Sequence, residues 1–314
     1  MNSKLYILIK PKPPLNFDLS CILTRRLRDK EIICSAYKDR IFYYSVYVEN
    51  LIIPVKVVFQ GDIWDPELHV YSLLPRAEKY YDTITNVVNW IFDVNLNLNE
   101  FYNYLSSDFV LKSVFQDLLG LRPLSTPSLF EAIVRAIIEQ QLPYFISRRI
   151  EDKLIKTLGP YIDVSGYRFY AFPTPEILAN TSKDILRNCS LSWRKIEYIQ
   201  NFSKMVLSKE IDLEKAHRLS SKGFMENFVR IKGIGPWTLR YVLVWALRRY
   251  DYTPVEDLFL RKVISHYYFK GKQISKDDVS ALCKSWGKWC GLVSYYLIIH
   301  YLLNYSNKHL GRMR

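Results

Sequence analysis

The spacing of hydrophobic residues changes once along the chain. Up to about residue 110 the apolar residues form short runs of β-branched and aromatic side chains, punctuated by Asn50, Pro54, Gly61 and Pro66. Runs of this kind are typical of strands. The pattern predicts an antiparallel sheet with strands near residues 5–9, 31–35, 40–47, 52–59 and 68–74, and helices near 18–28 and 80–92.

From there onward apolar residues recur every three or four positions, which indicates helices. Leu129, Ile133 and Ile137 share one face of a segment that Ser128 can cap. A second helix is expected at 147–158, before a glycine. A sheet region followed by a longer helical region places the chain in the α+β class, with most of it helical.

The most distinctive stretch predicts two helices joined by a glycine hairpin. Helical spacing stops at Gly233-Ile234-Gly235-Pro236 and resumes afterwards as far as Ala246. Two glycines supply the unusual backbone angles of a tight turn, and proline suits the first position of the next helix. Such a hairpin exposes amides that can bind phosphate. Taken alone, however, Gly-x-Gly more often marks a simple connection between helices.

The segment after the second helix decides between these interpretations. It reads P-V-E-D-L-F-L-R over 254–261, and Asp257 alone is best interpreted as a helix N-cap. Together with K-G-I-G-P-W-T at 232–238, it resembles the signature of the helix-hairpin-helix (HhH-GPD) DNA glycosylases, a hairpin followed by a loop that ends in an aspartate. The resemblance runs from about residue 125 to 300.

Within this superfamily the chain resembles the alkylpurine, or 3-methyladenine, branch, whose members carry an extra N-terminal α+β domain. The resemblance implies a domain over 1–110 that holds the antiparallel sheet. It implies an all-α hairpin core over 111–305. Residues 306–314 remain as a polar, basic tail.

The charge balance agrees with a polyanionic partner. Lys and Arg number 44 against 31 Asp and Glu, a net charge of +13. Basic proteins without nucleic-acid partners exist, so double-stranded DNA with damaged bases is the partner that the resemblance implies. No apolar run reaches the ~18 residues needed to span a membrane, and no signal peptide is visible. We expect an intracellular protein without a membrane partner, and a monomer.

The resemblance assigns catalysis to Asp257. Removing a base from deoxyribose puts positive charge on the sugar, which a partly buried carboxylate can stabilise while it orients the attacking water. Relatives that also cut the strand place a lysine nucleophile two residues after the second hairpin glycine, where this chain has Trp237. Lys232 precedes the hairpin and does not match. We therefore expect a monofunctional base-excision glycosylase that leaves an abasic site.

Two aromatic residues are candidates for the base pocket. Trp237 and Tyr241 are four apart and share a helix face. The matching positions of the alkylpurine branch line the pocket for the flipped base, and an aromatic wall suits a positively charged alkylpurine. On periodicity alone, both residues would be core aromatics packed against the N-terminal domain. Trp245, one turn further, is expected in the core.

DNA contacts are expected from the hairpin amides of Gly233, Gly235 and Thr238, with Lys232 beside them. Such a cluster binds phosphate without reading sequence. The helix at 128–141 resembles the family segment whose end places a side chain in the duplex where the base was. By position this residue is Gln141, with Leu142 as the alternative. A helix end without a DNA contact is the simpler interpretation of the same residues.

The sequence predicts no cofactor and no metal site with His or Cys ligands. The resemblance implies one monovalent cation, held by the carbonyls of Val229 and Ile231. Six residues separate Cys283 and Cys290, as they separate the first two of the four cysteines that hold an iron–sulfur cluster in some relatives. No third and fourth cysteine follow here, and a cluster needs four ligands, so we interpret the pair as coincidence.

Two other functions are compatible with these residues. A glycosylase for oxidised or deaminated bases would release 8-oxoguanine faster than methylated purines. A non-catalytic hairpin module that binds damaged DNA would show no product that depends on Asp257.

Overall fold

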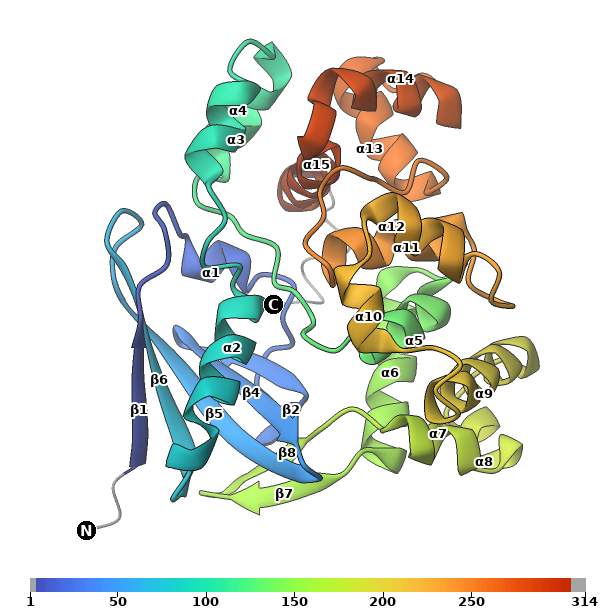
Figure 1. Ribbon diagram of the computed structural model, residues 1–314. Coiled ribbons are helices and arrows are strands. Elements are labelled where there is room, and N and C mark those ends of the chain that lie inside the picture. Colours follow the sequence, from blue (N-terminus) through green and yellow to red (C-terminus); the bar gives the residue numbers. More distant parts are fainter. Residues whose placement is uncertain (1–3, 306–314) are drawn as a thin grey trace.

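The computed structural model describes residues 4–305, so the proposed basic tail at 306–314 lies outside the described residues. These residues form one eight-stranded sheet and two groups of helices beside it (Figure 1). Within this range no helix combines the length and the apolar character needed to cross a membrane.

The sheet has the strand order β1-β6-β5-β4-β3-β2-β8-β7. Neighbouring strands are antiparallel except β2 and β8, which are parallel. The strands are β1 Lys4–Ile9, β2 Glu31–Ile33, β3 Ser35–Lys38, β4 Ile41–Val48, β5 Leu51–Gly61, β6 Pro66–Pro75, β7 Tyr161–Val164 and β8 Tyr167–Tyr170. Burial alternates along β6, because successive side chains of a strand point to opposite faces.

One face of the sheet is covered by α2, Tyr81–Ile91, which follows the 3-10 turn η1, Glu78–Tyr80 (Figure 1). Ile84, Val88 and Ile91 of α2 lie in the same core as the inward residues of β1, β4, β5 and β6. The helix expected at 18–28 is much shorter, since α1 is Phe17–Ser20. The chain after it is extended because Arg26 and Leu27 pair with Tyr37 of β3.

The first helical group contains the hairpin. Its helices are α5 Leu129–Glu139, α6 Tyr144–Leu158, α7 Pro175–Asn180, α8 Lys183–Asn188, α9 Trp193–Leu207, α10 Leu213–Arg218, α11 Ser221–Phe228 and α12 Pro236–Trp245. The central helix is α5, in which every residue except Arg135 and Glu139 is buried. These two exceptions are four residues apart and therefore lie on one face.

The second helical group joins two segments that are distant in sequence, residues 98–117 and residues 258–305. It consists of α3 Leu98–Tyr104, α4 Phe109–Asp117, α13 Leu258–Tyr268, α14 Lys276–Trp286, the 3-10 turn η2 Gly287–Trp289 and α15 Cys290–Tyr305. The ring of Phe101 in α3 lies 5.4 Å from that of Trp289 and 5.1 Å from that of Tyr296. The core of the sheet region ends at Val94 and this second core begins at Leu96, so packing changes earlier than the expected boundary at 110.

The expectation of an all-helical region over 111–305 is wrong for residues 161–170. These residues form the hairpin β7–β8, and β8 pairs with β2 of the N-terminal sheet. A strand edge with unpaired amides and carbonyls is costly to leave open, and this hairpin covers the edge of β2. It also fixes the first helical group against the sheet.

Candidate active site

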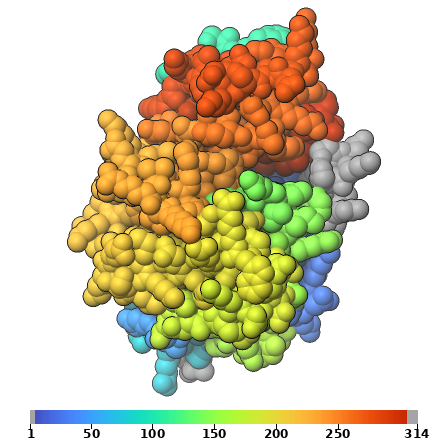
Figure 2. Space-filling view, turned by 90° about the vertical axis from the view of Figure 1, so that its right-hand side faces the viewer, coloured from blue at the N-terminus to red at the C-terminus, as the bar shows by residue number. Residues whose placement is uncertain are grey.

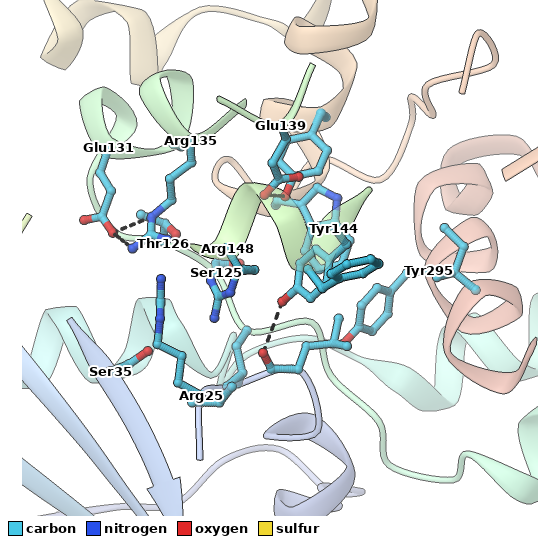
Figure 3. A pocket seen from close by; sticks show the side chains of 18 of the residues that line it. Arg25, Ser35, Ser125, Thr126, Glu131, Arg135, Glu139, Tyr144, Arg148 and Tyr295 are labelled. Atoms are coloured by element: carbon cyan, nitrogen blue, oxygen red, sulfur yellow. Dashed lines mark hydrogen bonds and ion pairs between the residues drawn. The ribbon is translucent and has the colours of Figure 1, made fainter. Parts of the chain in front are cut away.

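A cavity of about 470 Å³ lies where the sheet region and both helical groups meet. Its walls come from the loop after α1, from α5 and α6, from α12, from the start of α13 and from α15. In the view of Figure 3, Glu139 and Tyr144 lie between Arg135 on one side and Tyr295 on the other. The cavity is therefore built from segments distant in sequence, and no single motif defines it.

One wall of the cavity is a row of aromatic rings on α12. Trp237 and Tyr241 are stacked with 5.4 Å between ring centroids and 25° between ring planes. Tyr241 is followed by Trp245 at 5.6 Å, and Trp245 meets Tyr295 edge-on at 4.9 Å. All four line the cavity. Trp237 and Tyr241 thus face the cavity, and so does Trp245, for which the expected core position is wrong.

Asp257 stands at the edge of this wall as the N-cap of α13. One carboxylate oxygen accepts the amide of Leu260 at 2.8 Å, and the other accepts the indole N–H of Trp237 at 2.9 Å. The helix N-terminus favours negative charge at this position. The cap that local sequence rules predict is therefore present, and the same carboxylate also lines the cavity.

The hairpin lies between α11 and α12. Gly233 has a φ of +91°, and a Cβ there would lie 2.2 Å from the ring of Tyr198. Gly235 has a φ of −95°, and a Cβ there would extend into open space, so the expectation of unusual angles holds for Gly233 only. As the N-cap of α12, Gly235 brings no capping side chain to the first amides of that helix.

Two polar side chains join the hairpin to the end of α5. Gln140 donates through Nε2 to the carbonyl of Gly233 at 2.8 Å and to the hydroxyl of Thr238 at 2.9 Å. Lys195 of α9 donates to the carbonyls of Ile138 and Gln140, at 2.7 and 2.8 Å. Burial lowers the pKa of Lys195 to about 8. Lys195 therefore caps α5 and does not belong to a solvated face.

The segments expected to contact DNA belong to one face, on which α5–α6, α9 and the hairpin are neighbours (Figure 2), although the side chain of Thr238 is buried. Lys232 is exposed and forms a 2.6 Å ion pair with Glu197, which is also exposed. Gln141 is exposed at the turn after α5, with a φ of +58°, whereas Leu142 turns inward and lines the cavity. The geometry thus separates the two candidates for the inserted residue.

The carbonyls proposed to hold a cation lie just before the hairpin. Val229 is the C-cap of α11, and the carbonyl of Ile231 accepts the amide of Ile234 at 3.0 Å. A carbonyl oxygen has two lone pairs, so the Ile231 oxygen retains capacity for a cation. Among residues 4–305 no group of three or more His, Cys, Asp or Glu side chains could hold a metal ion.

A second carboxyl group lies in the cavity and was not predicted from the sequence. Glu139 is the last residue of α5, lines the cavity and accepts the Tyr241 hydroxyl at 3.1 Å. Burial, with a contribution from the charge of Glu151, raises the pKa of Glu139 to about 8. The sequence contains one local indication that Glu139 is unusual, because an acidic residue in the last turn of a helix opposes the helix dipole.

A buried ion cluster lies beside Glu139. Glu151 of α6 is fully buried and accepts hydrogen bonds from Arg25 at 3.1 Å, from Arg135, and from Arg148 at 3.5 Å. The three arginines together hold the pKa of Glu151 below its ordinary value in spite of its burial. Because Arg25 comes from the loop after α1, the cluster joins the N-terminal region to the helices.

Comparison with known proteins gives a family match over the hairpin region. Residues 134–288 match the family model described as HhH-GPD superfamily base excision DNA repair protein. A DNA-3-methyladenine glycosylase of Bacillus subtilis is 27% identical over 216 residues, which cover 69% of this chain and 71% of that protein.

Solved structures share the fold over nearly the whole chain. A 3-methyladenine DNA-glycosylase from Archaeoglobus fulgidus superposes with a TM-score of 0.83 at 23% identity, covering 96% of this chain and 99% of that one. An 8-oxoguanine glycosylase/lyase from Clostridium acetobutylicum, in complex with double-stranded DNA, superposes with a TM-score of 0.74 at 17% identity, covering 97% and 99%. The N-terminal sheet is thus part of the shared fold.

Proposed function

We propose that this chain, which belongs to the HhH-GPD superfamily of base excision DNA repair proteins, is a DNA glycosylase that releases alkylated purines of the 3-methyladenine type. The observation that carries the proposal is the position of Asp257, held by Trp237 beside an aromatic-walled cavity. The Bacillus subtilis relative, named a DNA-3-methyladenine glycosylase, supports the substrate class.

The cavity suits a purine that has left the duplex. A flipped base can stack against the Trp237–Tyr241 wall, and the electron-rich rings attract the positive charge of an alkylated purine. The sugar then lies at the mouth, beside Asp257. As the C1′–N9 bond breaks, the carboxylate stabilises the positive charge on the sugar and orients the water that adds to C1′.

We propose further that the enzyme does not cleave the strand. Imine formation with the sugar needs an amine near C1′. The described residues that line the cavity include no lysine, and the position that matches the lyase nucleophile is occupied by Trp237, whose indole supports Asp257. Lys232 is on the outer face, paired with Glu197.

Binding to double-stranded DNA is proposed for the face with the hairpin. The uncapped first amides of α12, including that of Thr238, and the amides of Gly233 and Gly235 are suited to one phosphate. Lys232 can exchange Glu197 for a phosphate because an exposed ion pair contributes little, on the order of 0–1 kcal/mol. The turn that carries Gln141 then enters the gap left by the base.

Two further properties belong to this proposal. The carbonyls of Val229 and Ile231 would hold a monovalent cation beside the phosphate, whose negative charge it would balance. The enzyme would act as a monomer without an organic cofactor.

The test is base release from methylated duplex DNA by the native protein and by Asp257→Asn. We expect the variant to release 3-methyladenine at least about 10²-fold more slowly, the size of effect seen when a group that stabilises transition-state charge is removed. Strand breaks should appear only after alkali. Intact DNA binding with no base release by the native protein would overturn the proposal in favour of a binding module.

A further inference from the structure

Glu139 occupies a position that the proposed reaction does not yet use. It is the last residue of the largely buried helix α5, and its carboxyl group faces the cavity. The hydroxyl of Tyr241 donates to it at 3.1 Å, from the ring that stacks on Trp237. The indole of Trp237 donates in turn to Asp257. The two carboxyl groups are therefore the two ends of one row of contacts along the aromatic wall.

When a base stacks on the aromatic wall, this row places one carboxyl group near the sugar and the other near the base. If the sugar lies beside Asp257, the base extends along the wall toward Glu139, and the edge that carries N7 and the 6-substituent can face that carboxyl group. The polar atoms of that edge need hydrogen-bond partners once they leave water. Glu139 is a polar group of the cavity in the right place to provide one.

We propose that Glu139 is a second catalytic residue, which in its protonated form donates a hydrogen bond to the ring edge of a flipped neutral purine and transfers its proton to that base as the glycosidic bond breaks. This inference rests on the proposed glycosylase function and extends its substrates from cationic to neutral purines.

A cationic purine can leave the sugar as a neutral molecule without help, whereas a neutral purine needs one added proton to do so. A purine methylated at N3 or N7 carries a positive charge, so the electron pair of the broken C1′–N9 bond leaves it neutral. A neutral purine would leave as an anion, which is a poor leaving group. With Glu139 as donor, N7, the free ring nitrogen on the edge that also carries the oxygen at C6, takes the proton, and the carboxyl group becomes a carboxylate. Water adds to C1′, gives its proton to Asp257 or solvent, and solvent reprotonates Glu139.

The surroundings of Glu139 favour the protonated form. Burial and the nearby negative charge of Glu151 raise the pKa of Glu139 to about 8, so the carboxyl group holds a proton below that pH. The titratable groups that face it are Arg135 on α5, Tyr144, Arg148 and Glu151 on α6, Lys195 on α9 and Tyr241 on α12. Of these, Lys195 also titrates near pH 8 and must be separated by experiment.

A purely structural role for Glu139 would be to fix Tyr241 through their hydrogen bond. Tyr241→Phe removes that hydrogen bond and keeps the aromatic ring, so it is the matched control. A positioning role would make Tyr241→Phe and Glu139→Gln change the release of both kinds of base in the same proportion. A proton donor would make only Glu139→Gln change the ratio between them.

The experiment measures single-turnover release from duplexes that carry one hypoxanthine, which is neutral, or one 7-methylguanine, which is cationic. We expect Glu139→Gln to lower the ratio of hypoxanthine to 7-methylguanine release by about 10²-fold, the lower range of general-acid effects. In the native protein hypoxanthine release should fall about tenfold for each pH unit above 8. That fall should be absent in Glu139→Gln.

Each other outcome overturns the inference in a different way. An unchanged ratio in Glu139→Gln leaves Glu139 as a positioning residue. An equal change of the ratio in Tyr241→Phe assigns the discrimination between the two bases to the hydrogen bond between Tyr241 and Glu139, and not to a proton from Glu139. A fall above pH 8 that persists in Glu139→Gln assigns the titration to Lys195. Release of 7-methylguanine without hypoxanthine by the native protein rejects the donor role alone. If the native protein releases neither base, and 3-methyladenine also stays attached to the DNA, the proposed function itself is rejected.

Discussion

The stacked pair Trp237–Tyr241 carries a carboxyl group at each end, Asp257 at one and Glu139 at the other, and the two lie in opposite surroundings. Asp257 is at the N-terminus of α13, where the helix favours negative charge, and both its oxygens accept N–H hydrogen bonds. Glu139 is at the C-terminus of α5, where the helix disfavours negative charge, and its neighbours include Glu151. One site is built to hold a carboxylate and the other to hold a carboxylic acid.

The difference shows how one fold can supply a base-like and an acid-like carboxyl group at the same pH. At Glu139 the surroundings favour the protonated form, because burial and the charge of Glu151 raise its pKa. The stacked pair Trp237–Tyr241 connects the two ends, because each ring donates one hydrogen bond to the carboxyl group nearest to it. Changing the surroundings of either end should therefore change its role without removing the carboxyl group.

The largest effect is expected where the surroundings of Glu139 are held together, at Glu151. Glu151→Gln removes the buried carboxylate that Arg25, Arg135 and Arg148 share, which should destabilise the fold by about 3 kcal/mol in urea unfolding. It also removes a charge that raises the pKa of Glu139, so the midpoint of the fall in neutral-base release should move below pH 8.

Asp152→Asn is the matched control for this change. Asp152 is the next residue and pairs with the same Arg25 at 2.6 Å, but its side chain is 36% exposed. Its loss should cost less than about 1 kcal/mol. Equal losses for the two variants would mean that burial of the ion cluster does not govern its contribution to stability, and the contrast between the two carboxyl groups would lose its electrostatic basis.

At the other end, Trp237→Phe removes the hydrogen bond to Asp257 and keeps an aromatic ring in the wall. A hydrogen bond to a charged group contributes about 1.5–3 kcal/mol, so release of methylated purines should fall by about tenfold or more. Trp245→Phe removes an indole from the same wall further along α12 and should lower the rate of release by a smaller factor. A larger loss for Trp245→Phe would show that stacking area, and not the support of Asp257, governs the rate.

The Asp257 end could be predicted from sequence because a compound motif marks it. Gly233, Trp237 and Asp257 lie within one stretch of 25 residues, in which Trp237 and Asp257 meet at 2.9 Å. The N-cap and the catalytic interpretation of Asp257 were alternatives in the sequence, and the structure contains the cap. The catalytic role stays a prediction, as do the DNA contacts of Lys232 and Gln141.

The Glu139 end could not be predicted because its partners are distant in sequence. Glu139 meets Tyr241 only after α5 packs on α12, and the neighbouring Glu151 has arginine partners from three different segments. The distance in sequence between partners also explains where the predicted fold was wrong. The hairpin β7–β8 completes a sheet whose other strands all lie before residue 76, and α3 packs on α15, which begins at residue 290.

The smallest effect expected concerns the stability that Asp257 contributes as a cap. Its carboxylate accepts the Leu260 amide at 2.8 Å, and asparagine can accept the same hydrogen bond with similar preference at this position. Asp257→Asn should therefore change the free energy of unfolding by only a few tenths of a kcal/mol, whereas Asp257→Ala should cost about 1 kcal/mol. Thermal unfolding of both variants measures the difference.

Similar stability with a large loss of activity in Asp257→Asn would separate the charge of Asp257 from its capping role. If Asp257→Asn instead destabilised the fold as much as Asp257→Ala, the lost activity could be assigned to a damaged helix start, and the contrast with Glu139 would have to rest on that end alone.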